Sequence, residues 1–235
     1  MFEPVEPISS EPHDSMIDVI NVYKKDLDRT LLRENLKLTV EERLRKAESF
    51  QASVTRWLGA GTPYGRRLQF VGKPGALDRI VQRLNEYGVK SIIIGGWATV
   101  MHGVARTHHD VDLVYSRTEK NIRQLAAALR DSQPYPRDAI SGLPFRWDEA
   151  TIQAGMNFEL MTLLGPVDLI GSVAGGGTFE ELLPFTQEAT AVGDTCRVVT
   201  LERLIHLKRA AGRPKDLETV AELEALREER ERMTS

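Results

Sequence analysis

The stretch IIIGGWATVMHGVARTHHDVDLVY, residues 92–115, contains the features that decide the fold. An apolar run ends at Gly95 and Gly96, and a short helical pattern follows them. Asp110 and Asp112 then interrupt the next apolar run, which otherwise has the composition of a buried strand. Because side chains alternate between the two faces of a strand, these carboxylates should point the same way, about 6.6 Å apart. The sequence therefore predicts two like charges on one face of a buried strand.

This spacing favours chemistry on a phosphate compound. Two carboxylates this close both stay ionised only where a cation lies near them, and Mg²⁺ binds carboxylates together with phosphate oxygens and water. A glycine pair lets the backbone approach a ligand closely, and the N–H groups at a helix start attract phosphate. Together these features suit nucleotidyl transfer, in which two metal ions about 4 Å apart neutralise a triphosphate and align a hydroxyl. Each feature also has a plainer interpretation, a tight turn for the glycines and a solvated strand face for the aspartates.

The composition is that of an ordinary globular protein. Its 235 residues suffice for one domain of moderate size with an appended segment. The formal net charge of −3 gives no overall attraction to nucleic acid or membranes, so a polyanion would need a local basic patch. Cys196 is the single cysteine, which precludes an internal disulfide and suits a reducing cytoplasm. The acidic, proline-rich start is unlike a signal peptide, and no apolar run approaches the roughly 20 residues that span a bilayer. We therefore expect a cytoplasmic protein that does not enter a membrane.

The first 65 residues are expected to form a disordered start and a helical extension. Residues 1–14 lack apolar periodicity, whereas a helical pattern follows them. Thr39 and Glu42 in the segment TVEE form a capping-box pattern, which predicts a helix from there to about Leu58. We interpret this extension as a packing arm or a dimerisation element, joined to the rest by a flexible, glycine-rich segment.

Helical and strand patterns alternate through the rest of the chain, which indicates an α/β fold. Helices are expected at 75–88, 97–103, 118–129 and 200–211, strands at 89–94, 111–115, 158–162 and 165–171, and a hairpin at 188–200. A last helix is expected to start near Lys215, after the helix breakers Gly212 and Pro214. Residues 132–150 are rich in loop-forming residues.

The segment GGWATVMHGVARTHHDVDL, residues 95–113, resembles the signature of the nucleotidyltransferase superfamily, which shares the catalytic palm of DNA polymerase β. Within the superfamily it is most similar to the AbiEii/AbiGii-type proteins, which include the toxins of toxin–antitoxin pairs. The matching residues are Gly95, Gly96, His102, Gly103, Arg106, Thr107, Asp110 and Asp112. The resemblance extends over residues 73–225. It implies a palm with a mixed sheet at residues 66–200, after the helical extension at 1–65, and C-terminal helices at 201–235 that complete the site.

The superfamily uses a third carboxylate on a neighbouring strand, and the resemblance assigns this role to Asp168. This residue interrupts the apolar strand GPVDLIG as Asp110 and Asp112 interrupt theirs. With them it would hold the metal ions, and it would draw the proton from the attacking hydroxyl. Glu159 in FELMT is the alternative residue, and a charge on an edge strand is the plainer interpretation of Asp168.

Basic residues near the C-terminal end complete the site that the resemblance implies. Lys208 lies on the apolar face of its helix, which is unusual unless its amine reaches a cleft or solvent. AbiEii-type proteins carry a lysine in such a helix and a basic–Asp pair at the start of the next. This implies that Lys208 and Lys215 bind the nucleotide and that Asp216 completes the catalytic set. The plainer interpretation is a basic helix end followed by a first-turn acid. Arg106 and Thr107 either contact phosphate or brace the loop before the strand.

These assignments predict a magnesium-dependent nucleotidyltransferase that binds an NTP, transfers the NMP to a hydroxyl and releases pyrophosphate. Two Mg²⁺ ions, held by Asp110, Asp112 and Asp168, are the expected cofactors, and Gly95 and Gly96 would approach the triphosphate. By analogy with toxin relatives, the acceptor is the 3′ end of tRNA or a protein side chain, and the expected partner is a cognate antitoxin. Two alternatives stay open. One is an aminoglycoside-type adenylyltransferase, with which the chain shares a Gly-Gly-Trp-Ala opening, and the other is a non-catalytic binding module.

Overall fold

One mixed β-sheet organises the protein. The computed structural model describes residues 15–57, 75–139, 144–191 and 193–234. The strands within them are β1 (Ser91–Ile93), β2 (Val111–Tyr115), β3 (Tyr135–Pro136), β4 (Asn157–Thr162), β5 (Gly165–Ile170), β6 (Thr186–Ala191) and β7 (Asp194–Val199). They form one sheet in the order β3-β4-β5-β2-β1-β7-β6. β2 is parallel to β5 and β1 is parallel to β7, while the other neighbouring pairs are antiparallel.

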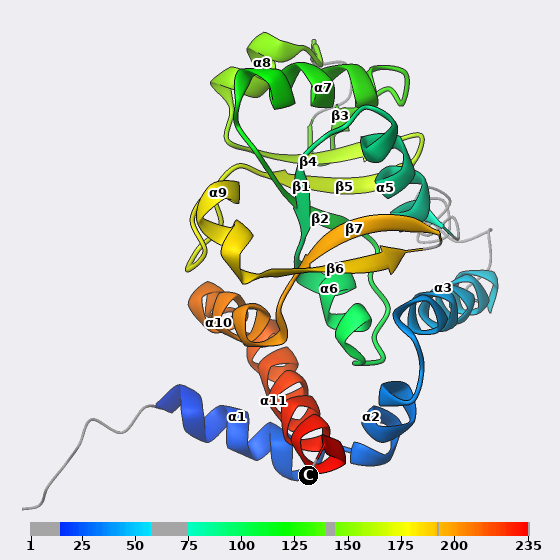
Figure 1. Cartoon of the computed structure of the whole chain (residues 1–235), viewed down its shortest axis with the longest axis vertical. Helices are drawn as coiled ribbons and strands as arrows, with labels where there is room; N and C mark the ends of the chain where they lie inside the picture. The colour runs from blue at the N-terminus through cyan, green and yellow to red at the C-terminus, as the bar shows by residue number, and fades with distance from the viewer. Residues whose placement is uncertain (1–14, 58–74, 140–143, 192, 235) are drawn as a thin grey trace, which may run out of the picture.

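Helices cover the sheet and extend beyond one end of it. They are α1 (Ser15–Lys25), α2 (Arg29–Leu36), α3 (Val40–Trp57), α5 (Ala76–Glu86), α6 (Gly95–His102), α7 (Glu119–Arg130), α8 (Glu149–Ala154), α9 (Phe179–Leu182), α10 (Leu201–Ala211) and α11 (Pro214–Thr234), with a 3₁₀ turn at Leu183–Phe185. Figure 1 shows α7 and α8 at one end of the molecule and α1, α2, α10 and α11 at the opposite end. The expected α/β class with a mixed sheet and flanking helices is confirmed.

The centre of the sheet is the core of the protein. Val111, Leu113 and Tyr115 of β2 are completely buried. Leu77 and Ile80, on the predicted apolar stripe of α5, are also completely buried. β2 is therefore held by neighbouring strands on both sides and by packed side chains, which makes it a rigid support for any functional group that it carries.

The first two helices pack against the C-terminal helix α11. Ile20 of α1 is buried, and Lys24 pairs with Glu228 of α11 at 2.5 Å. Arg33 of α2 pairs with Glu229 of α11 at 2.7 Å. These contacts are the packing-arm behaviour that the sequence suggests for this extension, while the division into three segments at residues 65 and 200 stays a prediction.

Several local signals act as the sequence predicts. The Glu42 N–H donates to Thr39 Oγ1 at 3.2 Å, and the Thr39 N–H donates to Glu42 Oε2 at 2.7 Å, so the capping box starts α3. Thr200 caps α10 by accepting from a backbone N–H at 3.4 Å, and Gly212 ends that helix with φ of +64°. The helical pattern after residue 14 is divided into two helices, because Asp28 caps α2.

The segment 132–150 is more regular than the sequence predicts, and some predictions fall outside the described residues. The loop-rich segment 132–150 also contains β3, which pairs with β4 at the edge of the sheet where a proline is tolerated, and the first turn of α8. The predictions for residues 1–14 and for the glycine-rich joint after Leu58 concern segments outside the described residues. None of the helices in the described residues is long and apolar enough to cross a membrane.

Candidate active site

The turn from β1 into α6 brings the glycine pair against Asp112. Gly95 has a left-handed backbone conformation with φ of +61°, and the Gly96 N–H donates to Asp112 Oδ2 at 3.3 Å. A Cβ at Gly95 would lie 2.9 Å from the Cβ of Asp112 and nearer still to its carboxylate, whereas ordinary contacts begin at 3.4 Å. The close approach that the glycines allow in this structure is therefore to a site carboxylate.

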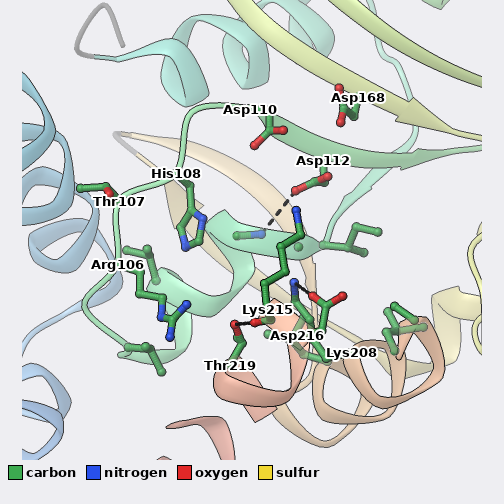
Figure 2. Close-up of a pocket in the computed structure, with 18 of the residues that line it drawn as sticks. Arg106, Thr107, His108, Asp110, Asp112, Asp168, Lys208, Lys215, Asp216 and Thr219 are labelled. Carbon is green, nitrogen blue, oxygen red and sulfur yellow. Dashed lines mark hydrogen bonds and ion pairs between the residues drawn. The ribbon is translucent and has the colours of Figure 1, made fainter. Parts of the chain in front are cut away.

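The three predicted aspartates converge on one cavity (Figure 2). Asp112 and Asp168 are register partners on the parallel strands β2 and β5, and Asp110 lies one residue before β2. Because β5 has a neighbouring strand on each side, Asp168 is not a charge on an edge strand. Glu159, the alternative residue, faces Asp168 in register from β4 and lines the same cavity, but it is exposed.

Burial and mutual repulsion disfavour the charged forms of these carboxylates. Burial, together with the charge of Asp110, raises the pKa of Asp112 to about 6. Burial also raises the pKa of Asp168, and the charges of the other two aspartates add to this effect. The pKa of Asp168 is about 7, although the Arg137 guanidinium acts to lower it. A cluster in this state favours a cation close to its oxygens.

Arg137 is a site residue that sequence reasoning missed. Its Nη2 pairs with Asp168, and its Nη1 lies 3.3 Å from Asp110 Oδ2. Its backbone N–H donates to the carbonyl oxygen of Glu159 at 2.8 Å, which fixes the residue beside β4. The surrounding segment PYPRDA has neither apolar periodicity nor a motif, so the sequence offers no signal for this placement.

The opposite wall of the cavity is formed by α10 and α11. Lys208 Nζ donates to Asp216 Oδ1 at 2.8 Å, and Arg213 Nε donates to Asp216 Oδ2 at 2.5 Å. The Asp216 side chain is 1% exposed. Burial acts to raise the pKa of Asp216, but the hydrogen bonds from Arg213 and Lys208 outweigh it and hold this pKa below its ordinary value. Asp216 is therefore an ionised anchor that fixes two basic side chains at the rim of the cavity.

Lys215 has a different environment from Lys208. It lines the cavity and makes no ion pair with any residue that the structure describes. Figure 2 shows its side chain extending from the start of α11 into the cavity, toward the side where Asp112 lies. Its ammonium group is therefore available to an anionic ligand between the two walls.

The loop before β2 forms a third side of the cavity. Arg106 pairs through Nε with Glu222 of α11 at 2.7 Å and through Nη2 with a second glutamate of that helix at 3.4 Å. Arg106 thus braces the loop, in agreement with one of its two interpretations, while both Arg106 and Thr107 line the cavity. The His108 ring packs on Gly96, and burial lowers the pKa of His108 to about 4, so the ring is neutral at pH 7.

The N-terminal helices close the remaining side. The cavity has a volume of about 1360 Å³ and is lined by Leu31 of α2 and by Lys46 and Phe50 of α3, besides the residues above. This volume exceeds the roughly 300–1,000 Å³ of most small-molecule sites. Arg43 Nη1 donates to the Met101 carbonyl at 2.7 Å and so ties α3 to α6. The extension that the sequence suggests as a packing arm therefore also supplies one wall of the candidate site.

The carboxylates fit a divalent cation by their chemistry, because they supply hard oxygen ligands from rigid strands. No group of three or more His, Cys, Asp or Glu side chains in the described part of the chain is already placed to hold a metal ion. The Arg137 guanidinium pairs with both Asp110 and Asp168. A divalent ion that bridges Asp110 Oδ2 and Asp168 Oδ1 would therefore take the place of Arg137.

Comparisons with known proteins find distant structural similarities. No family model matches the sequence, and no curated protein is significantly similar to it. A crystal structure of a Thermotoga maritima protein described as a candidate nucleotidyltransferase is 18% identical, has a TM-score of 0.41, and covers 62% of this chain and 88% of its own. The crystal structure of ANT(2″)-Ia in complex with adenylyl-2″-tobramycin is 17% identical, has a TM-score of 0.42, and covers 68% and 97%. The solution structure of the antibiotic-resistance factor ANT(2″)-Ia is 18% identical, has a TM-score of 0.41, and covers 68% and 91%.

Proposed function

We propose that the protein is a metal-dependent nucleotidyltransferase that moves an NMP from an NTP to a hydroxyl group of an acceptor. The observation that supports this is the placement of Asp110, Asp112 and Asp168 on one side of a cavity whose opposite side carries Lys208 and Lys215. A triphosphate between these walls would meet metal-binding carboxylates on one side and ammonium groups on the other. The signature at residues 95–113 supports an AbiEii/AbiGii-type member of the superfamily.

The proposed reaction forms a bond from the acceptor oxygen to the α-phosphorus as the bond to pyrophosphate breaks. Asp110, Asp112 and Asp168 would hold Mg²⁺, which when bound neutralises the triphosphate and aligns the attacking hydroxyl. Asp168 would accept the proton of that hydroxyl. Lys208 would neutralise charge on the departing pyrophosphate.

Other predicted residues have supporting parts in this proposal. Lys215 would bind a phosphate oxygen directly, because its ammonium group has no competing ion pair among the described residues. Asp216 would act by positioning Lys208, with which it pairs at 2.8 Å. The Gly96 N–H, which donates to Asp112, would orient that carboxylate. Arg106 and Thr107 would form the rim next to the triphosphate.

For the acceptor, we propose an RNA 3′ end, that of tRNA in the first instance. The cavity is larger than one nucleotide requires, so part of an acceptor fits beside the NTP. Lys46 and Lys215 line it without an acidic partner among the described residues, which suits a polyanion better than a polycationic drug. A protein hydroxyl is the second acceptor class to be tested. A toxin role with a cognate antitoxin would follow from the RNA acceptor if modification stops growth.

One observation favours a second function, that of a non-catalytic binding module. Arg137 neutralises Asp110 and Asp168 in the structure. If this pairing were permanent, the carboxylates would stabilise the fold and would never hold a metal ion.

Transfer of label from α-³²P-labelled NTPs tests the proposal. The wild type, Asp112→Asn and Asp168→Asn are incubated with Mg²⁺ and each NTP, with tRNA, a protein extract or an aminoglycoside as acceptor. Arg197→Gln is the matched control, because Arg197 lies on the β6–β7 hairpin, where its side chain pairs with Glu188 and Thr186 and with no other described residue. We expect label on tRNA with the wild type and the control, reduced at least about 100-fold in the aspartate variants. Equal labelling by all four proteins, or none by any, contradicts the proposal.

Growth measurements test the toxin role separately. Expression of the wild type should arrest bacterial growth, and Asp112→Asn, produced at the same level, should not. Growth arrest by both proteins would separate toxicity from nucleotidyl transfer. Protection of cells against an aminoglycoside without growth arrest would instead assign the drug acceptor.

A further inference from the structure

Arg137 occupies a position that no motif in the sequence explains. Its guanidinium pairs with Asp168 from β5 and, at 3.3 Å, with Asp110 before β2. Within the described parts of the chain its side chain has no further partner, and its buried Nε makes no hydrogen bond there. The two aspartates are therefore bridged by a single monovalent cation that is attached to the protein.

We propose that Arg137 is a displaceable counter-ion of the carboxylate cluster, which competes with divalent metal for Asp110 and Asp168 and withdraws when metal and nucleotide bind. This inference rests on the proposed nucleotidyl transfer, since that reaction requires a metal ion at these oxygens. Arg137 would then be a positioning residue that sets when the site loads its metal.

The competition follows from the shared atoms. Arg137 contacts Asp168 Oδ1 and Asp110 Oδ2, and a divalent ion bridging the same aspartates would lie within a few ångströms of the guanidinium. Two cations so close repel each other, and the energy of that repulsion is large in a partly dry site. Both cations cannot keep the same pair of carboxylate oxygens, so one must leave.

The structure makes Arg137 the cation that can leave. The residue is fixed through its backbone N–H to the Glu159 carbonyl, so its side chain can turn without unfolding β3. Withdrawal breaks only the two ion pairs that a metal would replace, because Nε has no partner to lose among the described residues. The Arg137 side chain is 27% exposed, which leaves it a path toward the open part of the cavity.

None of the other basic groups facing the cavity bridges these aspartates in the described residues, since no ion pair there joins Lys46 or Lys215 to Asp110 or Asp168. Lys208 and Arg213 are committed to Asp216 at 2.8 and 2.5 Å, and Arg106 is committed to α11. After withdrawal the Arg137 guanidinium would still lie beside the bound triphosphate, where its planar fork suits phosphate oxygens. The nucleotide would thereby stabilise the displaced state, so metal should bind well only together with NTP.

Binding of Mn²⁺, followed by the electron paramagnetic resonance signal of the free ion, tests this competition without catalysis. The proteins are the wild type, Arg137→Gln, Arg137→Lys, Asp168→Asn and the control Arg197→Gln, each with and without a non-hydrolysable ATP analogue. Without nucleotide, Arg137→Gln should bind Mn²⁺ about tenfold or more tightly than the wild type. Arg137→Lys, which keeps the charge, and Arg197→Gln should stay within about twofold of the wild type. With the ATP analogue present, the difference in Mn²⁺ affinity between Arg137→Gln and the wild type should become smaller.

Equal or weaker Mn²⁺ binding by a folded Arg137→Gln overturns the proposal, and circular dichroism establishes that it is folded. The wild-type protein supplies a second measurement, the ¹⁵Nε–¹H signal of Arg137 during Mg²⁺ titration with the ATP analogue. We expect this signal to shift, and a signal that does not change overturns the proposal. If no variant binds Mn²⁺ even with the analogue, the metal-dependent function itself fails. If wild type and Arg137→Gln bind equally while Asp168→Asn does not bind, the Arg137 proposal alone fails.

Discussion

Replacing Gly95 by alanine should slow nucleotidyl transfer about 100-fold at a modest cost in stability. Gly95 has φ of +61°, a conformation that costs an L-residue about 1–2 kcal/mol. The new methyl group would lie 2.5 Å from Asp112 Cγ and nearer still to Oδ2, so the carboxylate must retreat by more than about 0.9 Å to reach the 3.4 Å of ordinary contact. A displacement of about 1 Å at a reacting group can cost about 100-fold in rate.

Gly193→Ala is the matched control for this substitution. Gly193 has φ of +85°, and a methyl group at this position would have nothing within 4 Å, so alanine there carries the backbone cost without a clash. In urea unfolding, the free energy of unfolding should fall by about 1–2 kcal/mol for Gly193→Ala and by somewhat more for Gly95→Ala. In the labelled-NTP assay, only Gly95→Ala should lose about 100-fold in rate. Wild-type activity in a folded Gly95→Ala would show that a glycine is not needed at this position to place the Asp112 carboxylate.

Three further predictions concern groups around the same cavity. Gly96→Ala would place a methyl group 2.8 Å from His108 Cε1, so its thermal stability should fall, and adding His108→Ala should restore most of it. Asp112 has a folded pKa of about 6 against an ordinary 3.8, so its contribution to stability is fully present below pH 4 and is lost as the pH rises through 6. In metal-free urea unfolding between pH 4 and pH 7.5, the free energy of unfolding of the wild type should therefore fall by up to about 3 kcal/mol relative to that of Asp112→Asn. A difference between the two proteins that does not change with pH would contradict this prediction. Asp216→Asn should cost about 2–3 kcal/mol in the free energy of unfolding, because it leaves Lys208 without its anionic partner. An unchanged unfolding midpoint would show that the buried pair contributes nothing.

The sequence predicts the parts of the site that depend on local patterns. The strand–glycine–helix turn, the strand with Asp112 and the capped helices α3 and α10 each follow from residues near one another in the chain. Parallel pairing of β2 with β5 then places Asp168 beside Asp112. The turn, the strand and the caps are accessible because periodicity and caps are local, whereas the place of Asp168 near Asp112 is implied only by the resemblance to the nucleotidyltransferase superfamily.

Features that depend on packing between distant segments are not predictable from the sequence. Arg137 reaches the aspartates because an edge strand without periodicity pairs with β4, which no residue in its segment indicates. The partners of Arg106 lie more than 100 residues away on α11. Phe50 lines the cavity because α3 packs on α6. The glycine pair predicts a triphosphate as the close neighbour of Gly95, whereas in the structure that neighbour is Asp112.

A crystal structure of the wild-type protein with Mn²⁺ and a non-hydrolysable NTP analogue would show whether the three aspartates hold metal beside a bound triphosphate. Anomalous diffraction locates Mn²⁺ independently of the protein density. We expect a peak coordinated by Asp110, Asp112 and Asp168, the triphosphate between them and Lys208, and the Arg137 guanidinium withdrawn from both aspartates. Nucleotide bound elsewhere, or Mn²⁺ absent from these oxygens with Arg137 still bridging them, would contradict it.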